Sequence, residues 1–209
     1  LVIKIEGKND LAVIGGVVNA DITQSAVAQS VGGQMTITDV DNPAQFLPQT
    51  NTRGSNGFGY GTFSLNASGA WTYTMDGPHK ELVAGMVYTD SLTAVSADGT
   101  AQTIVVTLHG TNDAPVLADT LLRLTTTLQG QAPLNGQVMG TLVSNLVAGI
   151  TDVDAGGTRG MAITGFNSGG KLWISLNGGS TWTEQTGVSA SSAIGLLADA
   201  DNRLSLIHI

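Results

Sequence analysis

The sequence has no cysteine, few charged residues and no long apolar run, and each of these absences excludes a class of protein. Without cysteine among its 209 residues, the chain has no disulfide bonds, thiolate metal sites or thiol catalysis. Eight Lys and Arg against sixteen Asp and Glu give a net charge of −8, so no basic surface for nucleic acid is predicted. The longest uncharged stretch, 124–151, is interrupted by Gln and Asn residues and predicts no membrane-spanning segment.

The sequence instead contains much glycine and many short segments that alternate polar and apolar residues. Glycine accounts for 28 residues, and the hydrophobic content of 42% is sufficient for folded cores. Alternating segments that flank Gly, Asn, Asp or Ser turns predict hairpins over 60–75, 86–108 and 171–183. The nearest approach to a helical pattern, 189–199, predicts only a short helical turn. The predicted fold class is all-β, with tandem antiparallel Greek-key β-sandwiches of the immunoglobulin or cadherin-like kind.

Two pairs of similar segments indicate that the chain is repetitive. Residues 2–10 match residues 105–113, because both are an alternating strand followed by Gly-x-Asn-Asp, at an offset of 103 residues. Thr-Asp-Val-Asp occurs at 38–41 and again at 151–154, at an offset of 113 residues. A repeat of roughly 100 residues is too long for a solenoid unit and is typical of globular modules in a string.

Four segments of the first module identify a family. They are Met-Thr-Ile-Thr-Asp-Val-Asp at 35–41, Gly-Tyr-Gly-Thr-Phe-Ser-Leu at 59–65, Ser-Gly-Ala-Trp-Thr-Tyr at 68–73 and Gly-Thr-Asn-Asp-Ala-Pro-Val at 110–116. Because these segments occur in the order typical of the family, residues 12–115 resemble a VCBS repeat. This repeat is a bacterial cadherin-like domain that occurs in tandem in large RTX-type adhesins.

The flanking residues predict parts of two further modules. Segments at 140–143, 151–154, 160–165, 175–182 and 196–199 make residues 116–209 resemble a related cadherin-like module. Residues 1–11 are predicted to be the last strand of a preceding repeat. Residues 204–209 do not continue the expected strand and resemble translated sequencing-adapter sequence. The second module is therefore predicted to be truncated, with a non-native end.

The resemblance implies a structural function rather than an enzymatic one. Modules of this kind extend large secreted or cell-surface proteins of bacteria, and Ca²⁺ bound between neighbouring modules stiffens them. For this chain the resemblance implies an extracellular role in cell adhesion. The implied partners are adjacent repeats of the same chain, with host-surface or matrix glycans and proteins bound by other domains. The sequence has neither a Gly-x-Ser-x-Gly nor a His-Glu-x-x-His motif, and its turn histidine, His79, is predicted to be exposed.

Two Asp-x-Asp pairs, Asp39 with Asp41 and Asp152 with Asp154, are the candidate metal ligands that spacing suggests. Side chains at i and i+2 of an extended segment lie on the same side, so each pair can converge on one ion. Ca²⁺ takes about 6–8 oxygen ligands from Asp, Asn and backbone carbonyls. Asp is also an ordinary turn residue whose carboxylate accepts hydrogen bonds from nearby backbone N–H groups. Spacing alone leaves both a metal site and a structural turn open.

The resemblance adds the Gly-x-Asn-Asp segments to the metal sites. In cadherin-like proteins the junction between modules supplies a carboxylate and an amide oxygen, and the next module supplies the Asp-x-Asp pair. Asn112 and Asp113 are therefore expected to pair with the second Asp-x-Asp, and Asn9 and Asp10 with the first. The predicted Ca²⁺ ligands are Asn9, Asp10, Asp39, Asp41, Asn112, Asp113, Asp152 and Asp154.

The sequence departs from the family at the sites and in one strand. The family usually has an acid near the positions of Gln24 and Gln129, so each site lacks one carboxylate. In the second module Leu172 stands where the family commonly has a Trp, and Trp173 occupies the next, opposite-facing position. Trp173 and Trp182 both lie near the tip of the predicted hairpin. An alternative function follows: a carbohydrate-binding module in which exposed Trp173 and Trp182 stack on a sugar ring.

Overall fold

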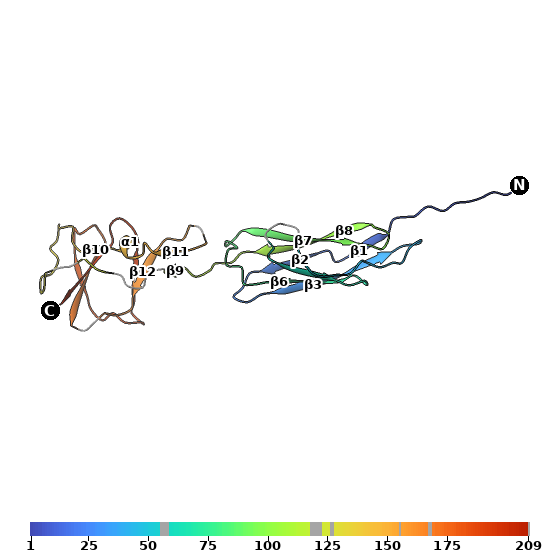
Figure 1. Cartoon of the computed structure of the whole chain (residues 1–209). Coiled ribbons are helices and arrows are strands. Elements are labelled where there is room, and N and C mark those ends of the chain that lie inside the picture. The colour runs from blue at the N-terminus through green and yellow to red at the C-terminus, as the bar shows by residue number, and fades with distance from the viewer. Residues whose placement is uncertain (55–58, 118–122, 126–127, 155, 167–168, 209) are drawn as a thin grey trace. The chain divides into compact units, whose positions relative to one another are not determined.

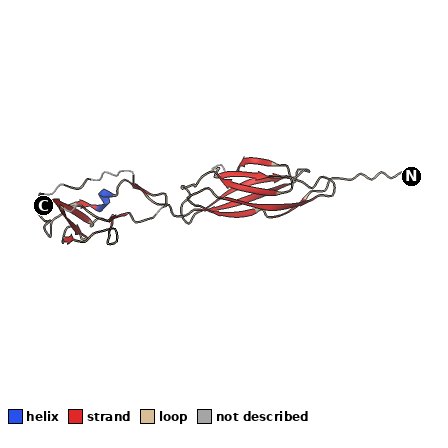
Figure 2. Ribbon diagram, turned by 90° about the horizontal axis from the view of Figure 1, so that it is seen from below, coloured by secondary structure: helices blue, strands red, loops and turns tan. Residues whose placement is uncertain are grey.

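The computed structural model describes residues 1–54, 59–117, 123–125, 128–154, 156–166 and 169–208. The chain divides into two compact units, Leu1–Asp113 (unit 1) and Ala114–Ile209 (unit 2), and each is described by itself. Nearly all regular structure is β-strand, and most strand pairs are antiparallel, which confirms the predicted all-β class (Figures 1 and 2). Within the described ranges, no helix has the length and apolar character needed to cross a lipid bilayer.

Unit 1 contains two sheets. The larger sheet is antiparallel throughout and has the strand order β1 (Val13–Gly16), β3 (Ser30–Thr38), β6 (Ala70–Met75), β5 (Gly61–Leu65), β4 (Gln49–Arg53). The smaller sheet has the order β2 (Asn19–Thr23), β8 (Ala101–His109), β7 (Val87–Val95). In it, β8 is parallel to β2 and antiparallel to β7. The first two predicted hairpins are present as β5–β6 and β7–β8.

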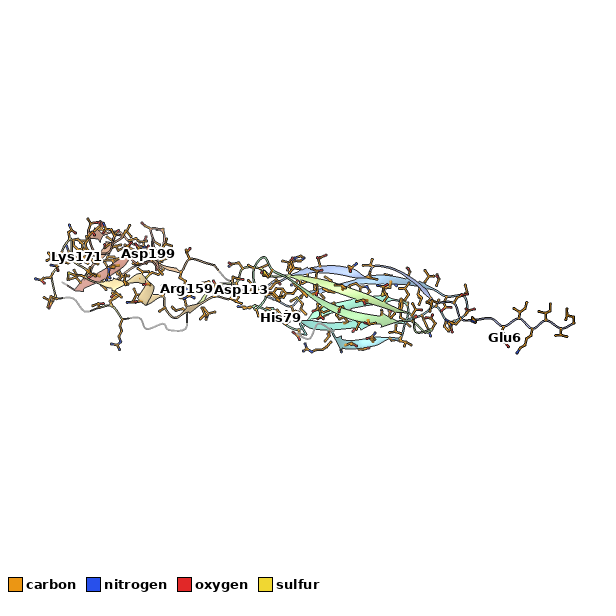
Figure 3. All side chains as sticks on the ribbon, turned by 90° about the horizontal axis from the view of Figure 1, so that it is seen from above. Glu6, His79, Asp113, Arg159, Lys171 and Asp199 are labelled. Atoms are coloured by element: carbon orange, nitrogen blue, oxygen red, sulfur yellow. The ribbon has the colours of Figure 1, made fainter. Side chains whose placement is uncertain are left out.

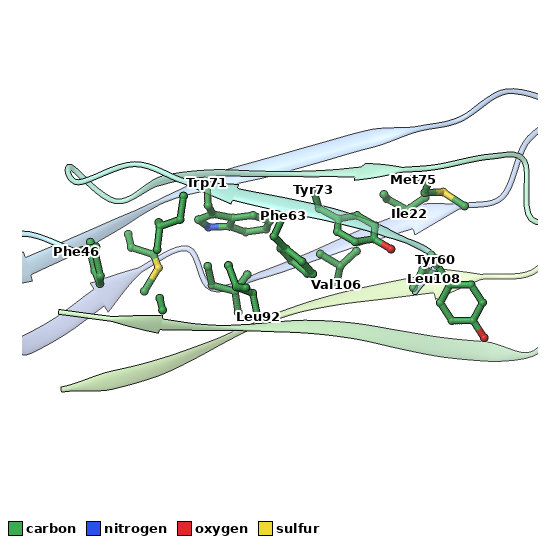
Figure 4. Packing of buried hydrophobic residues seen from close by; sticks show 14 of the residues in the cluster. Ile22, Phe46, Tyr60, Phe63, Trp71, Tyr73, Met75, Leu92, Val106 and Leu108 are labelled. Atoms are coloured by element: carbon green, nitrogen blue, oxygen red, sulfur yellow. The ribbon is translucent and has the colours of Figure 1, made fainter. Parts of the chain in front are cut away.

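The core of unit 1 lies between these sheets, and the period-two pattern of the strands decides which residues enter it. On β6, Trp71, Tyr73 and Met75 are buried while the intervening threonines are exposed. The indole N–H of Trp71 donates to the carbonyl of Val17 at 2.7 Å, so this buried donor is satisfied. Figure 4 shows these side chains packed between the strands. The same alternation on β8 buries Ile104, Val106 and Leu108.

Residues 1–11 form no strand within unit 1, so their assignment as the last strand of a preceding repeat stays a prediction. The segment is extended and projects from unit 1 (Figure 1), and most of its apolar side chains are exposed, among them Leu1, Ile3 and Ile5. A strand needs a neighbouring strand for its backbone and a core for its apolar face. No strand of unit 1 pairs with this segment, and its counterpart in the repeat, β8, lies between β2 and β7.

Unit 2 contains one four-stranded sheet and two strand pairs. The sheet has the order β10 (Thr141–Leu142), β16 (Arg203–His208), β13 (Gly170–Ser175), β14 (Thr183–Gln185). The pairs are β9 (Val116–Leu117) with β11 (Ile150–Thr151), and β12 (Gly160–Ile163) with β15 (Ile194–Leu197). The third predicted hairpin is present as β13–β14. A short helix, α1 (Val143–Leu146), follows β10 directly.

Two predictions for unit 2 are wrong. Residues 204–208 do continue a strand, because β16 pairs with β13 along its whole length and buries Leu204 and Ile207. Ile209 lies outside the described residues. Residues 189–199 contain strand β15 rather than a helical turn, since the backbone of 194–197 pairs with β12. The core of unit 2 is formed by Val143, Leu146, Val147, Leu172, Ile174, Leu196 and Leu204.

Candidate metal sites

Both Asp-x-Asp loops follow a strand pair of the same kind. In unit 1, Thr38 at the end of β3 pairs with Val13 at the start of β1. In unit 2, Thr151 at the end of β11 pairs with Val116 at the start of β9. Each Asp-x-Asp therefore begins one residue after an antiparallel pairing, at the point where the chain leaves the sheet. The similarity of the two segments in sequence extends to their register.

The first carboxylate of each loop caps a turn. Asp39 Oδ1 accepts the backbone N–H groups of Asp41 and Asn42, both at 2.8 Å. Asp152 Oδ1 accepts the N–H of Asp154 at 3.0 Å. The structural turn that spacing left open is therefore present in both loops. A turn of this kind uses a single carboxylate oxygen, so it does not exclude a metal ion at the other oxygen.

The second oxygen of Asp39 is the strongest indication of a cation site. Asp39 Oδ2 is buried and has no hydrogen-bond partner among the described residues. Close by, Asp41 Oδ2 accepts the N–H of Asp10 at 2.7 Å, and Asn9 Oδ1 accepts the side-chain amide of Asn42. The structure thus brings Asn9 and Asp10 together with Asp39 and Asp41. A buried carboxylate oxygen without a partner is costly, and a cation is the partner that best offsets that cost.

A third loop in unit 2 has the same turn but a different outcome. The N–H groups of Asp201 and Asn202 donate to Asp199 Oδ1 at 3.0 and 2.6 Å. The side-chain amide of Asn202 also donates to Asp199 Oδ2 at 2.8 Å, so both oxygens are satisfied. In unit 1 the equivalent amide, that of Asn42, donates to Asn9 instead. The two turns therefore differ in where the Asn side chain donates. In unit 2 it donates to the Asp199 carboxylate, whereas in unit 1 it donates to Asn9 and leaves Asp39 Oδ2 unpaired.

The role of the Asn42 amide was not predicted from the sequence. Asp-x-Asp-Asn occurs at 39–42 and again at 199–202, and the fourth residue matters in both loops. The recurrence of the four-residue pattern was the available signal. The direction of the amide was not predictable, because it depends on whether a second segment approaches the loop.

At the C-terminal end of unit 1, the carboxylate of Asp113 accepts a hydrogen bond from the neutral amide of Gln24. Gln24 is 5% exposed, and its side-chain N–H donates to Asp113 Oδ2 at 2.8 Å. The Gln24 side-chain oxygen accepts the N–H of Thr111 at 3.0 Å, which fixes the direction of the amide. Asn112 donates to the carbonyl of Asp113 at 2.9 Å, as Asn9 does to the residue that follows it. The amide of Gln24 therefore holds Asp113 without a second charge.

The second Asp-x-Asp pair borders a cavity. Asp154 is nearly buried, whereas Asp152 is exposed. The cavity has a volume of about 260 Å³ and is lined by Pro115, Ile150, Asp152, Asp154 and residues 156–160. Arg159 is among the lining residues, so an ion held by the two carboxylates would share the cavity with a positive charge.

Carboxylates alone do not complete any of these sites. In the part of the chain that the structure describes, no three His, Cys, Asp or Glu side chains form a group that could hold a metal ion. A cation at Asp39 and Asp41 would therefore also need amide or backbone oxygens, such as that of Asn9. Asn112 and Asp113 belong to unit 1 and the second Asp-x-Asp pair belongs to unit 2, so their pairing stays a prediction.

The tryptophans of unit 2 do not form the exposed pair that the carbohydrate-binding alternative requires. Trp182 is 6% exposed, and its indole N–H donates to the carbonyl of Gln137 at 3.4 Å. The loop crosses the ring closely, since a Cβ on Gly140 would lie 2.9 Å from Trp182 Cη2. Trp173 is half-buried, and its indole N–H is buried without a partner among the described residues. Trp182 therefore lacks the exposure that this alternative requires.

His79 is not exposed, in contrast to the prediction from its turn. Its Nε2 lies 2.7 Å from Asp76 Oδ1 and its Nδ1 lies 2.6 Å from Glu81 Oε1, while Tyr60 contacts the ring edge-on. Burial lowers the pKa of His79, but the hydrogen bond and negative charge of Glu81, together with hydrogen bonds to the Tyr60 backbone and to Asp76, outweigh burial and raise it overall. Arg53 pairs with the other oxygen of Asp76 at 2.8 Å, so the cluster joins two loops of unit 1.

Comparisons with known proteins add no relative. A scan against protein-family models finds no match, and a search of curated proteins finds no significant match. The resemblance to VCBS repeats therefore depends on the segments quoted above, and what it implies about function is a proposal.

Proposed function

We propose that the chain comprises two consecutive cadherin-like modules, each a Greek-key β-sandwich, from a large bacterial adhesin. Their role is to extend a secreted or cell-surface protein, with Ca²⁺ stiffening the segments that join neighbouring modules. The all-β structure and the matching strand registers before the two Asp-x-Asp loops support this proposal. The role is structural rather than enzymatic.

The observation that carries the proposal is the unpaired Asp39 Oδ2 within the cluster of Asn9, Asp10 and Asp41. A hard cation prefers carboxylate and amide oxygens, which are the groups gathered here. Extracellular Ca²⁺ sites have dissociation constants of roughly 10⁻⁴–10⁻³ M. At a free Ca²⁺ concentration about ten times higher, binding stabilises the folded unit by about 1.4 kcal/mol.

Stiffening follows from which segments the cluster connects. Asp39 and Asp41 belong to the loop after β3, whereas Asn9 and Asp10 belong to the segment that leads into unit 1. In the absence of a cation, these two segments are joined by the hydrogen bonds from Asp10 to Asp41 and from Asn42 to Asn9. A cation shared by both segments would hold residues 1–10 in one direction and so transmit the orientation of a preceding module.

The test is a Ca²⁺ titration of the full chain with matched Asp→Asn variants. Wild type should show a rise in the unfolding midpoint with millimolar Ca²⁺, and Asp39→Asn should lose that rise. Asp199→Asn is the control, because it changes the same turn at a carboxylate whose two oxygens are already bonded. An equal midpoint with chelator and with Ca²⁺, or an equal response in the Asp39 and Asp199 variants, would refute the metal site.

Stiffening is measured separately with a label at residue 4. Because the chain has no cysteine, Lys4→Cys carries a single spin label on the exposed segment. Ca²⁺ should slow the motion of this label, and Asp39→Asn should abolish the slowing. A label that moves equally fast with and without Ca²⁺ would leave an ion site but remove the proposed stiffening.

A further inference from the structure

A carboxylate of unit 1 holds the backbone of the entering segment two residues after Asp10. The N–H of Ala12 donates to Asp98 Oδ2 at 2.9 Å. Ala12 is 6% exposed, whereas Leu11 before it is 73% exposed, and β1 begins one residue after Ala12. The chain therefore changes from an exposed segment to a part of the fold at the residue that Asp98 binds.

Asp98 lies in the turn of the β7–β8 hairpin and is itself fixed there. Its Oδ1 accepts the N–H of Thr100 at 3.0 Å and the hydroxyl of Ser96. Its Oδ2 accepts the Thr100 hydroxyl at 2.8 Å in addition to the bond described above. The turn is also held from outside the hairpin, because the N–H of Ala97 donates to the carbonyl of Gln45 at 2.9 Å. The Asp98 carboxylate is therefore a fixed acceptor rather than a freely rotating side chain.

The hydrogen bond to Ala12 connects the two sheets of unit 1 at one end. Strand β1, directly after Ala12, belongs to the larger sheet, and the hairpin that contains Asp98 belongs to the smaller sheet. Two residues earlier, the N–H of Asp10 donates to Asp41 in the loop after β3 of the larger sheet. The entering segment is therefore held by one carboxylate from a loop of each sheet. Figure 3 shows Glu6 on the extended part of the chain that precedes these contacts.

The contact at Asp98 needs neither a cation nor a particular pH. Hydrogen bonds from Ser96, Ala12 and Thr100 hold the pKa of the Asp98 carboxyl well below its ordinary value. The side chain is therefore ionised throughout the neutral range, and both of its oxygens accept hydrogen bonds. Asp39 differs, because its Oδ2 has no partner among the described residues. Asp98 thus holds the chain in every ionic condition, whereas Asp39 requires a cation to do so.

The segment that leads into unit 2 has no backbone donor at the corresponding position. At the offset of 103 residues that relates 2–10 to 105–113, Ala12 corresponds to Pro115. Proline has no backbone N–H, so Pro115 cannot donate to a carboxylate as Ala12 does. An anchor of this kind is therefore specific to the entry into unit 1.

We propose that Asp98 is a positioning residue: by binding the N–H of Ala12, it fixes the point at which the preceding segment enters unit 1, with or without a cation. That this segment joins two modules rests on the proposed function, whereas the anchoring itself does not. With Ala12 fixed, Asp10 lies two residues from a fixed point and stays close to the loop after β3. A cation at Asp39 then orders only a short stretch of chain, and a short loop costs little entropy to close.

Asp98→Asn in the full chain tests the anchor in chelator, with Ser96→Ala as the matched control. Asparagine has one acceptor oxygen instead of two, so it can still accept the N–H of Thr100 but presents an NH₂ group to Ala12. Hydrogen exchange at the Ala12 amide should accelerate about 10- to 100-fold, as expected for the loss of a hydrogen bond to a charged group. The Thr100 amide should stay protected. Ser96→Ala removes a donor to Asp98 but keeps the bond to Ala12, so the Ala12 amide should exchange as in wild type.

The position of the segment is measured with two spin labels, at Leu11→Cys and Thr72→Cys, because both residues are exposed and the chain has no other cysteine. In chelator, the distance distribution between the labels should be broader with Asp98→Asn than without it, and Ser96→Ala should leave it unchanged. Ala12→Pro removes the donor but leaves the turn intact, and it should broaden the distribution as Asp98→Asn does.

Three results would overturn the proposal. The first is an Ala12 amide that exchanges equally fast in wild type and in Asp98→Asn. The second is a distance distribution that Ser96→Ala broadens as much as Asp98→Asn does, which would show only a weakened turn. The third is an unchanged distribution in Ala12→Pro. Because no cation is present in these measurements, they decide on the anchor whether or not the unfolding midpoint responds to Ca²⁺, and a missing response would remove the metal site alone.

Discussion

Gln24→Glu introduces an acid where VCBS repeats, which the sequence resembles, usually have one, and the structure predicts that it destabilises unit 1 unless a cation is present. Gln24 is buried and donates to Asp113 Oδ2 at 2.8 Å. A carboxylate at this position would lose that hydrogen bond and face a second carboxylate. The N–H of Thr111 would still be accepted, so the local backbone should not change.

Two estimates give the loss of unfolding free energy that Gln24→Glu causes. Two unit charges about 4 Å apart repel by about 4 kcal/mol at an effective dielectric constant of about 20. The new side chain can escape the repulsion by taking up a proton, and raising a Glu pKa from about 4.3 to 7 corresponds to about 3.7 kcal/mol. We therefore expect unit 1 to lose about 3–4 kcal/mol of unfolding free energy at pH 7 in chelator.

Hydrogen exchange of the buried strands β6 and β8 measures this loss in unit 1 alone, since the slowest amides exchange by global unfolding. Exchange should accelerate between about 10²- and 10³-fold at pH 7. Added Ca²⁺ should recover part of the protection, because a cation between the introduced carboxylate and Asp113 replaces repulsion by attraction. Gln45→Glu, the same change at an exposed residue, should exchange like wild type. Unchanged protection of Gln24→Glu in chelator would refute the argument.

Two further predictions concern buried polar groups of unit 1. Tyr73→Phe removes the O–H that donates to buried Asp90 at 3.0 Å and should lower the unfolding free energy by about 1.5–3 kcal/mol in urea titrations, and an unchanged midpoint would contradict this. His79→Asn keeps a residue that tolerates the positive φ of 46° but removes the imidazolium between Asp76 and Glu81. Because the folded pKa of His79 is raised, the stability it contributes is complete below about pH 6.5 and disappears as pH rises through the folded pKa. The difference between wild type and this variant should therefore be larger at about pH 5.5 than at about pH 8.5, and a difference independent of pH would show that the ion pairs contribute nothing.

The strands that the sequence predicts are those in which alternation and a turn coincide. The hairpins β5–β6, β7–β8 and β13–β14 satisfy both conditions, so local pattern was sufficient. Helix α1 has only four residues, too few for a helical period to be visible. Residues 204–208 have no clean alternation, because Leu206 and Ile207 are adjacent, so their pairing with β13 was not evident from the pattern.

Residues 2–6 have the pattern of a strand but form none in this structure. Their pattern is as regular as that of β8, yet the structure gives them no partner in unit 1. Alternation indicates that a segment can be a strand, but a strand also needs an edge to pair with and a core to cover. Those requirements depend on the rest of the fold, which the pattern of six residues does not contain.

The candidate site was predictable in residue types but not in which oxygens stay unpaired. Spacing left a turn at Asp39 and at Asp152 as one of two alternatives, and the structure shows a turn at both. The resemblance supplied Asn9 and Asp10 as neighbours of the first turn. Whether a carboxylate in such a turn needs a cation depends on a hydrogen bond to its second oxygen. That bond comes from a flexible side chain, whose direction is decided by distant segments.

Side-chain amides therefore determine where a cation would act in this chain. Asp113 receives the amide of Gln24, and Asp199 receives that of Asn202, so both carboxylates have a neutral donor in every solution condition. Asp39 lacks such a donor because Asn42 turns to Asn9. Neutral donors stabilise a carboxylate without a second charge, whereas a cation adds charge only when its concentration is high enough. If the proposed function is correct, a response of unit 1 to Ca²⁺ should originate at the loop after β3 and change how firmly residues 1–10 are held.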